Sequence, residues 1–128
     1  MNPILGRRGA VVAPHALASQ AGLEILREGG NAIEATIAVA ATLAVVYPHM
    51  TGIGGDGFWL MHAPGQAMQS IDACGAAGAG VTRALYGDRV SIPWRGPLAA
   101  NTVAGTISGW GAAYAYSQAN WGGKLPFA

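Results

Sequence analysis

The 128-residue sequence is poor in charged side chains. Only 10% of its residues are Asp, Glu, Lys or Arg, against roughly 25% in an average soluble domain. After Arg89 the remaining charged side chains are Arg95 and Lys124. The formal net charge of +1 gives no electrostatic reason to expect a nucleic acid or an anionic membrane as a partner. The 52% of hydrophobic residues exclude an intrinsically disordered chain.

Cysteine and long apolar runs are also scarce. The single cysteine, Cys74, cannot form an internal disulfide. The longest uncharged apolar run, residues 35–47, is shorter than the roughly 20 residues of a membrane-spanning helix, so we expect a buried helix there and no membrane partner. The first residues lack the apolar core of a secretory signal. We therefore expect a cytoplasmic protein if Met1 is the true start, and a periplasmic or secreted one if a signal peptide was removed.

Small side chains are abundant. Alanine is the most frequent residue and the chain holds 20 glycines. Small residues let helices and strands approach closely, but each buries little area, at roughly 25 cal/mol per Å². Together with the scarcity of charge, this composition predicts one layer of a larger structure. We expect residues 1–128 to form a single incomplete domain whose apolar faces are covered by protein outside it.

Two helices are predicted in the first part of the chain. Apolar residues recur at helical spacing over residues 15–27, and Gly29-Gly30 ends that helix. Asn31 and Glu34 then have the spacing of a capping box. The second helix runs to about Val46, is apolar nearly all round, and stops before Pro48.

The rest of the chain predicts a hairpin and a third helix. Residues 58–62 and 69–73 read as two strands joined by a turn. Residues 102–118 predict a helix in spite of three internal glycines, which indicates that another element packs directly on it. Residues 81–101 predict no regular element.

The glycine-rich loop of residues 51–57, TGIGGDG, is the most suggestive motif. Its glycines do not have the spacing of a dinucleotide-binding loop, and it follows a helix and precedes a strand, which is the reverse of that motif. It also lacks the Gly-Lys-Ser/Thr ending of a Walker A loop. Nucleotide binding is therefore not expected.

The three histidines do not predict a metal site. No pair among His15, His49 and His62 lies three or four residues apart, and no second thiol completes a ligand set. His15 is best explained as a capping or packed residue at a helix start, and His62 as a solvated residue at a strand end. His49 is the one that lies beside the glycine-rich loop.

Cys74 is the one side chain that could act as a strong nucleophile, but no neighbouring base or cation is apparent to activate it. The simpler interpretation is a small buried residue. Asp72, and likewise Asp56 in the glycine-rich loop, could accept hydrogen bonds from loop amides or serve only as turn residues. Residue types and spacing alone therefore reach an Ala/Gly-rich α/β (α+β) fragment without a nucleophile–base pair.

Several segments resemble the γ-glutamyltranspeptidase family. The most specific are PHALASQAGLEILREGGNAIEA (residues 14–35) and PHMTGIGGDGF (residues 48–58), followed by SIDACGAAGAG (residues 70–80) and the stretch from residue 101 to residue 128. They occur in the family's order and cover nearly the whole chain.

The resemblance implies the four-layer αββα fold of N-terminal-nucleophile hydrolases, here an N-terminal fragment of the large subunit. In that family one precursor cleaves itself into a large and a small subunit, and the new N-terminal threonine of the small subunit attacks a small-molecule amide. No catalytic residue would lie in residues 1–128. The small subunit of the same precursor would be the partner, and neither a cofactor nor a metal is implied.

One position departs from the family pattern. The resemblance places Cys74, with Asp72 two residues before it, where typical members carry the arginine that binds the α-carboxylate of the γ-glutamyl donor. A thiol cannot form the bidentate, charge-assisted pair that an arginine forms with a carboxylate. Arg83 or Arg95 could reach into the site instead.

Three functions remain open at this point. The first is an amidohydrolase or acylase with an altered donor, such as oxamate or an acylated drug-like amine. The second is a glutathione hydrolase and transpeptidase whose donor carboxylate is bound by another residue. The third is a non-catalytic structural or binding member.

The composition yields a prediction for residues 1–128 expressed alone. We expect this chain to aggregate or to stay molten, because its apolar faces lack the layers that would cover them. Size-exclusion chromatography and thermal unfolding measure this directly. A monomer with a cooperative unfolding transition would show that the chain is a self-contained module.

Overall fold

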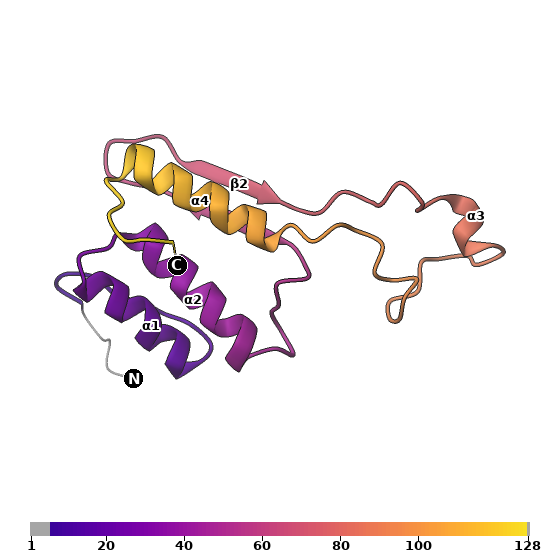
Figure 1. The fold of residues 1–128 in the computed structure, drawn as a ribbon, viewed down its shortest axis with the longest axis horizontal. Helices are drawn as coiled ribbons and strands as arrows, with labels where there is room; N and C mark the ends of the chain where they lie inside the picture. The colour runs from indigo at the N-terminus through magenta and orange to yellow at the C-terminus, as the bar shows by residue number, and fades with distance from the viewer. Residues whose placement is uncertain (1–5, 128) are drawn as a thin grey trace.

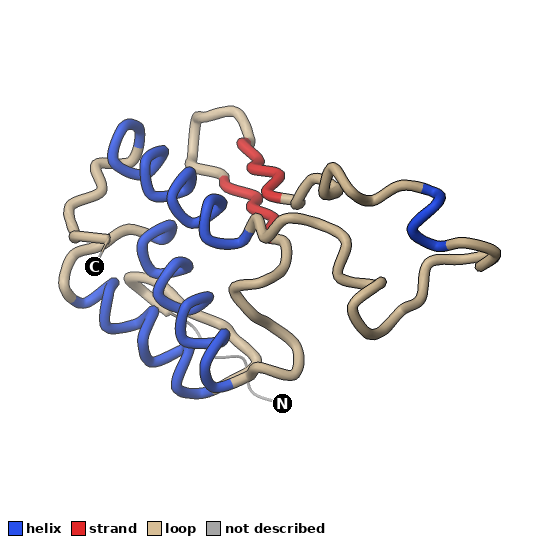
Figure 2. Tube along the Cα trace, turned by 45° about the vertical axis from the view of Figure 1, so that its right-hand side comes forward, coloured by secondary structure: helices blue, strands red, loops and turns tan. Residues whose placement is uncertain are grey.

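The computed structural model describes residues 6–127, and Met1, on which the expected compartment depends, lies outside this range. Three long helices form a body, from which the segment between the hairpin and the last helix projects (Figures 1 and 2). The elements in chain order are α1 (Ala16–Arg27), α2 (Ala32–Val46), β1 (Gly57–Met61), β2 (Gln69–Ala73), α3 (Arg83–Tyr86) and α4 (Thr106–Asn120). None of the helices described has the length and apolarity that crossing a bilayer requires.

The first two helices and the hairpin are confirmed, with β1 starting and ending one residue earlier than predicted. The predicted start of the third helix at Thr102 is wrong, because α4 begins at Thr106. Thr102 instead forms an antiparallel bridge with Ala77, and the Val103 amide donates to the Ala76 carbonyl at 2.9 Å. Pairing with this distant segment therefore replaces the first helical turn. The sequence also missed α3, which has only four residues.

The hairpin has one packed face and one open face. Antiparallel pairing sets Trp59 opposite Ile71, and these side chains face the helices, while Phe58 and Leu60 point away and are 71% and 72% exposed. Successive strand residues alternate between faces, so this register separates the two sets cleanly. The open face carries two large apolar side chains that nothing in residues 6–127 covers.

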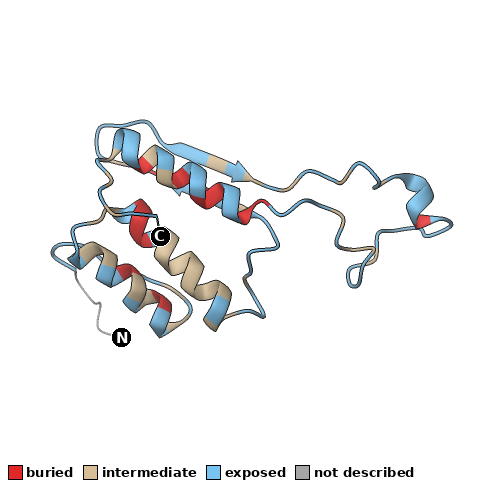
Figure 3. Cartoon of the chain, in the orientation of Figure 1, coloured by how far each residue is buried: buried red, intermediate tan, exposed pale blue. Residues whose placement is uncertain are grey.

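The core lies where α2, α4 and the hairpin meet, as the buried positions along α4 show (Figure 3). Its buried members are Ile33, Trp59, Met61, Trp110 and Ala113. The first helix packs on α2 through Gly22, where a Cβ would lie 2.6 Å from a methyl of Val39. A side chain at position 22 would therefore push the two helices apart.

A buried carboxylate connects the start of α2 to the chain that follows α4. Glu34, only 6% exposed, closes the capping box predicted at the start of α2 by accepting from the Asn31 amide at 2.8 Å. Its other oxygen accepts from the Lys124 and Leu125 amides at 2.8 and 3.0 Å. The Asn31 side-chain amide donates to the fully buried Ser117 hydroxyl at 2.7 Å. The start of α2 thus holds the end of α4 and the chain that follows it.

Glu34→Gln in the full-length parent protein should lower the free energy of unfolding by about 1–3 kcal/mol, the usual cost of leaving buried donors without acceptors. The glutamine amide would turn an NH₂ group towards backbone N–H groups that now meet a carboxylate oxygen. Chemical denaturation measures the loss.

Glu24→Gln is the matched control, because Glu24 pairs with Arg27 at 2.9 Å on the surface of α1 and exposed pairs contribute roughly 0–1 kcal/mol. Equal effects of the two substitutions would show that the Glu34 network adds nothing to stability.

Candidate functional site

The glycine-rich loop is fastened to the first turn of α4. The Gly55 carbonyl accepts from the Gly105 amide at 2.9 Å, the Thr106 amide at 3.0 Å and the Thr106 hydroxyl at 2.8 Å. Thr106 is buried. Two of the amides at this helix start, a place that elsewhere binds anions, are therefore already engaged by the protein's own loop.

Two aspartates hold the corner that follows β2. Asp72 Oδ1 accepts from the Cys74 amide at 2.9 Å, and Asp56 Oδ1 accepts from the Gly75 amide at 2.8 Å. Both aspartates thus bind loop amides, as their sequence positions suggested. Asp56 also joins the glycine-rich loop to the corner, so the two segments form one unit.

Close backbone contacts make this corner rigid. A Cβ at Gly75 would overlap the Val103 carbonyl, and one at Gly105 would overlap the Ala73 carbonyl. At Gly109 a Cβ would lie 2.7 Å from the Ala73 Cβ. The prediction that another element packs on the helical glycines is confirmed at Gly109. It is wrong at Gly111, which faces open space.

Cys74 lies at the tip of the corner with its side chain exposed, so the expectation of a buried thiol is wrong. It borders a shallow cleft of about 510 Å³ between the end of β2 and α4, lined by Asp72, Val103 and Ser108 among others. The backbone hydrogen bonds of this corner turn the Cys74 side chain outwards. A group bound in the cleft would meet the thiol directly.

The electrostatic field at Cys74 is negative. The charge of Asp56 raises the pKa of the Cys74 thiol above its ordinary value, and desolvation and Asp72 add to the shift. The thiol is therefore protonated and neutral at physiological pH. This argues against a nucleophilic role, because the thiolate is the reactive form.

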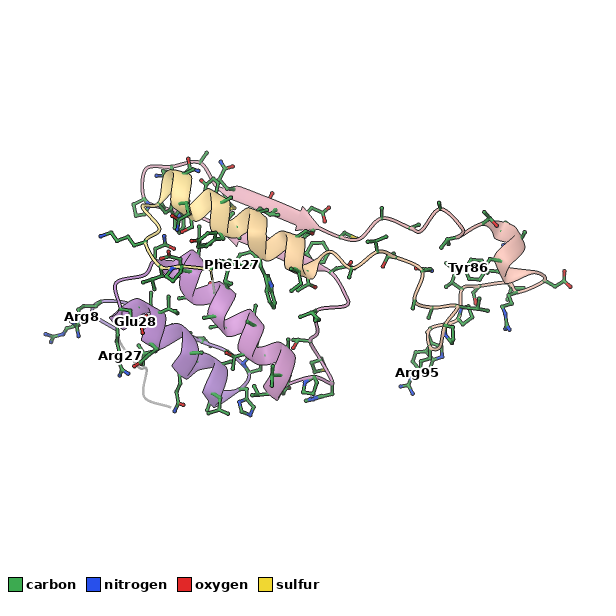
Figure 4. All side chains as sticks on the ribbon, in the orientation of Figure 1. Arg8, Arg27, Glu28, Tyr86, Arg95 and Phe127 are labelled. Carbon is green, nitrogen blue, oxygen red and sulfur yellow. The ribbon has the colours of Figure 1, made fainter. Side chains whose placement is uncertain are left out.

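Neither arginine that could replace the missing cation lies at this corner. Arg83 begins α3, and Arg95 lies in the projecting segment, well away from the end of β2 (Figure 4). The only ion pair among residues 6–127 joins Arg27 to Glu24. Asp56 and Asp72 are thus not neutralised by any cation of the described chain.

Each of the three histidines has a position that its local structure explains. His15 caps α1 by accepting from the Leu17 amide at 3.2 Å, as its position predicted. His49 lies against the Tyr47 ring, with centroids 4.2 Å apart, and His62 follows β1 on the surface. Across residues 6–127 there is no group of three or more His, Cys, Asp or Glu side chains that could hold a metal ion.

A second cleft, lined largely by apolar residues, was not anticipated from the sequence. It has a volume of about 580 Å³ and lies between α2, the glycine-rich loop and the start of α4, with Leu43, Trp59 and Trp110 in its wall. No sequence pattern indicated it, because its wall combines segments that are far apart in the chain. Trp59 and Trp110 are buried in the core, whereas Trp94 is exposed.

The sequence profile of the γ-glutamyltranspeptidase family matches residues 18–128. The chain belongs to the γ-glutamyltranspeptidase family. The region matched is the N-terminal part of the family's large subunit, as the motifs around Asn31 and the glycine-rich loop indicated.

Two curated relatives of this family differ in their stated substrates. The chain is 58% identical over 120 residues to an oxamate amidohydrolase proenzyme of Klebsiella pneumoniae, covering 94% of this chain and 23% of that protein. It is 50% identical over 110 residues to a glutathione hydrolase-like proenzyme, YwrD, of Bacillus subtilis, covering 85% and 21%. The chain thus spans about a fifth of the length of these relatives.

Solved γ-glutamyltranspeptidase-like structures share the fold. The γ-glutamyltranspeptidase of Pseudomonas nitroreducens, complexed with L-DON, superposes with a TM-score of 0.80 at 33% identity, over 96% of this chain and 36% of that one. The cephalosporin acylase of Bacillus halodurans gives 0.74 at 32% identity, over 98% and 24%. The expected fold class is confirmed: the chain is a part of the αββα fold of N-terminal-nucleophile hydrolases.

The field at Cys74 gives a testable pH dependence. Asp56→Asn removes the largest source of the raised pKa while keeping an oxygen for the Gly75 amide, so alkylation of Cys74 by iodoacetamide should begin at lower pH than in the unaltered protein. The rate is followed by mass spectrometry across the alkaline range in the full-length protein. Asp88→Asn, in the projecting segment, is the control and should leave the profile unchanged. A profile unmoved by Asp56→Asn would mean that Asp56 does not act on the thiol.

Proposed function

We propose that the chain belongs to the large subunit of a self-processing amide hydrolase whose donor has a short acyl group, such as oxamate. The hydrolysis would be carried out by an N-terminal threonine elsewhere in the precursor. That nucleophile attacks the amide carbon, the amine or ammonia leaves, and water releases the acyl group from the threonine. Residues 6–127 would supply a wall of the donor site, with Cys74 at its far end.

The observation that carries this proposal is the exposed, uncharged thiol of Cys74 on a rigid corner. In a γ-glutamyl donor the α-carboxylate lies several bonds from the amide carbon, so binding it calls for a cation at a distance from the nucleophile. In oxamate the carboxylate is attached directly to the amide carbon. A donor of that size has no group that would reach position 74 and needs no cation there.

The charges around the thiol support the same choice. Asp56 and Asp72 both lie close to Cys74, and no cation among the described residues pairs with them. A carboxylate brought to this corner would be repelled by both, and it would lack the charge-assisted hydrogen bonds, worth roughly 1.5–3 kcal/mol, that an arginine provides. The corner therefore disfavours a γ-glutamyl donor. The 58% identity to an oxamate amidohydrolase proenzyme points in the same direction.

A glutathione hydrolase is the second candidate, favoured by the 50% identity to a glutathione hydrolase-like proenzyme. It requires another residue to bind the donor carboxylate. Arg83 and Arg95 would have to come from the projecting segment, or the cation would have to come from outside residues 6–127.

The test uses the full-length protein and the single substitution Cys74→Arg. We expect the unaltered protein to split into two subunits, seen by mass spectrometry, and to release ammonia from oxamate with little turnover of a γ-glutamyl anilide. Cys74→Arg should raise kcat/KM for the γ-glutamyl anilide by at least about tenfold, which corresponds to about 1.4 kcal/mol of added transition-state binding.

Cys74→Ser is the matched control, because it removes the sulfur without adding charge. It should leave the hydrolysis of oxamate and of the anilide close to the unaltered values. Strong turnover of the anilide by the unaltered protein would overturn the proposal in favour of the glutathione hydrolase. A protein that neither splits nor hydrolyses any amide would favour a non-catalytic member of the family.

A further inference from the structure

The cleft beside Cys74 is larger than the proposed donor. It has a volume of about 510 Å³, which lies within the roughly 300–1,000 Å³ usual for sites that bind small molecules. Oxamate, whose carboxylate is attached directly to the amide carbon, would occupy only a small part of this space. Most of the cleft would then take no part in binding the donor.

The side chains around the cleft are mostly small and apolar. Ile71 on β2 and Ala112 on α4 line it, together with Ala76, Val103 and Ala104. Val103 is 63% exposed, so this wall is open to an occupant. An apolar wall binds aliphatic groups, because each methylene taken out of water strengthens binding by up to roughly fourfold.

The polar side chains of the cleft already have partners within the protein. The Ser108 hydroxyl donates to the Gly105 carbonyl at 2.7 Å, and Asp72 Oδ1 accepts from the Cys74 amide at 2.9 Å. No lysine, arginine or histidine among residues 6–127 lines the cleft. An occupant would therefore find few hydrogen-bond partners there and no cation to pair with a carboxylate.

The charge at the Cys74 end of the cleft selects against anions. Asp72 lines the cleft, and Asp56 is held beside it by accepting from the Gly75 amide at 2.8 Å. Asp56 first, and desolvation and Asp72 after it, raise the pKa of the Cys74 thiol, so the field here is negative and the thiol stays uncharged. A chain that ends in a carboxylate would be repelled, whereas an uncharged chain would not.

We propose that this cleft binds uncharged aliphatic acyl chains, such as a pentanoyl group, which gives the enzyme a second class of amide donor. The proposal rests on the proposed function, because hydrolysis needs the same threonine nucleophile. The threonine oxygen would form an ester with the acyl carbon as the C–N bond breaks and the amine leaves with a proton. Water would then release the carboxylic acid and restore the threonine.

The first test compares two matched p-nitroanilides in the full-length protein. In the glutaryl anilide a carboxylate replaces the terminal methyl of the pentanoyl anilide, so the two donors differ mainly in charge. We expect kcat/KM, measured from the release of p-nitroaniline, to be at least about tenfold higher for the pentanoyl anilide. A protein that hydrolyses oxamate but shows no such preference would overturn this proposal alone and leave the proposed function standing.

Ala112→Leu tests whether the acyl chain occupies the cleft. Ala112 is exposed on α4 and lines the cleft, so a leucine there would fill part of the space without displacing the core. The ratio of kcat/KM for the pentanoyl anilide to that for the acetyl anilide should fall by at least about tenfold. This ratio does not depend on how much of the protein is active.

Ala115→Leu is the matched control, because Ala115 is also exposed on α4 but does not line the cleft. It should leave the ratio unchanged. Equal effects of the two leucine substitutions, or no effect of either, would place the acyl chain outside the cleft and overturn the proposal.

A binding measurement tests the cleft without turnover. Butyl methyl ketone, an analogue of pentanamide that cannot be hydrolysed, should slow the alkylation of Cys74 by iodoacetamide, because an occupant of the cleft covers the thiol. The same ketone with a carboxylate in place of its terminal butyl methyl should not slow it at equal concentration. Protection by both compounds or by neither would overturn the proposal. Protection by the uncharged ketone alone, in a protein that hydrolyses no amide, would support the binding site and reject the proposed function.

Discussion

The placement of α4 depends on one buried carboxylate. Glu34 accepts three backbone N–H groups, one at the start of α2 and two in the chain after α4, and burying a charge is tolerated when it is hydrogen-bonded in this way. The adjacent Asn31–Ser117 contact fixes the last turns of α4. The other end of α4 holds the glycine-rich loop through Gly55, and Asp56 of that loop binds the Gly75 amide. The geometry of the Cys74 corner therefore depends on the position of α4, which is fixed at both of its ends.

The scarcity of charged residues in the sequence agrees with the uncovered apolar surfaces of the structure. Phe58 and Leu60 on the hairpin, and Val90 and Trp94 in the segment between β2 and α4, expose large apolar surfaces that in a free-standing domain would favour aggregation. Charged side chains are rare in the interior layers of a large fold, because both faces of such a layer are buried. The composition and the open surfaces thus have the same cause.

The sequence predicted local features well and distant contacts poorly. The capping box of Asn31 and Glu34 and the cap at His15 were readable, because their partners lie within a few residues. The bonds from Glu34 to residues 124–125 were not, since nothing in the sequence marks a pair of amides some 90 positions away. The start of α4 was wrong for the same reason: helix propensity at 102–105 gave way to pairing with residues 76–77. Family resemblance located Cys74 with Asp72 beside it, but only the structure gave the exposure of the thiol and its proximity to Asp56.

The closely packed backbone around Cys74 has a consequence for which side chains position 74 can accept. Gly75 cannot accept a side chain because of the Val103 carbonyl, and Ala73 is packed against Gly105 and Gly109. Between them, position 74 points outwards and is free of packing constraints. A single codon there can exchange the thiol for a cation or a larger group without disturbing the backbone contacts of Gly75, Gly105 and Gly109, so residue 74 can vary while the scaffold stays unchanged.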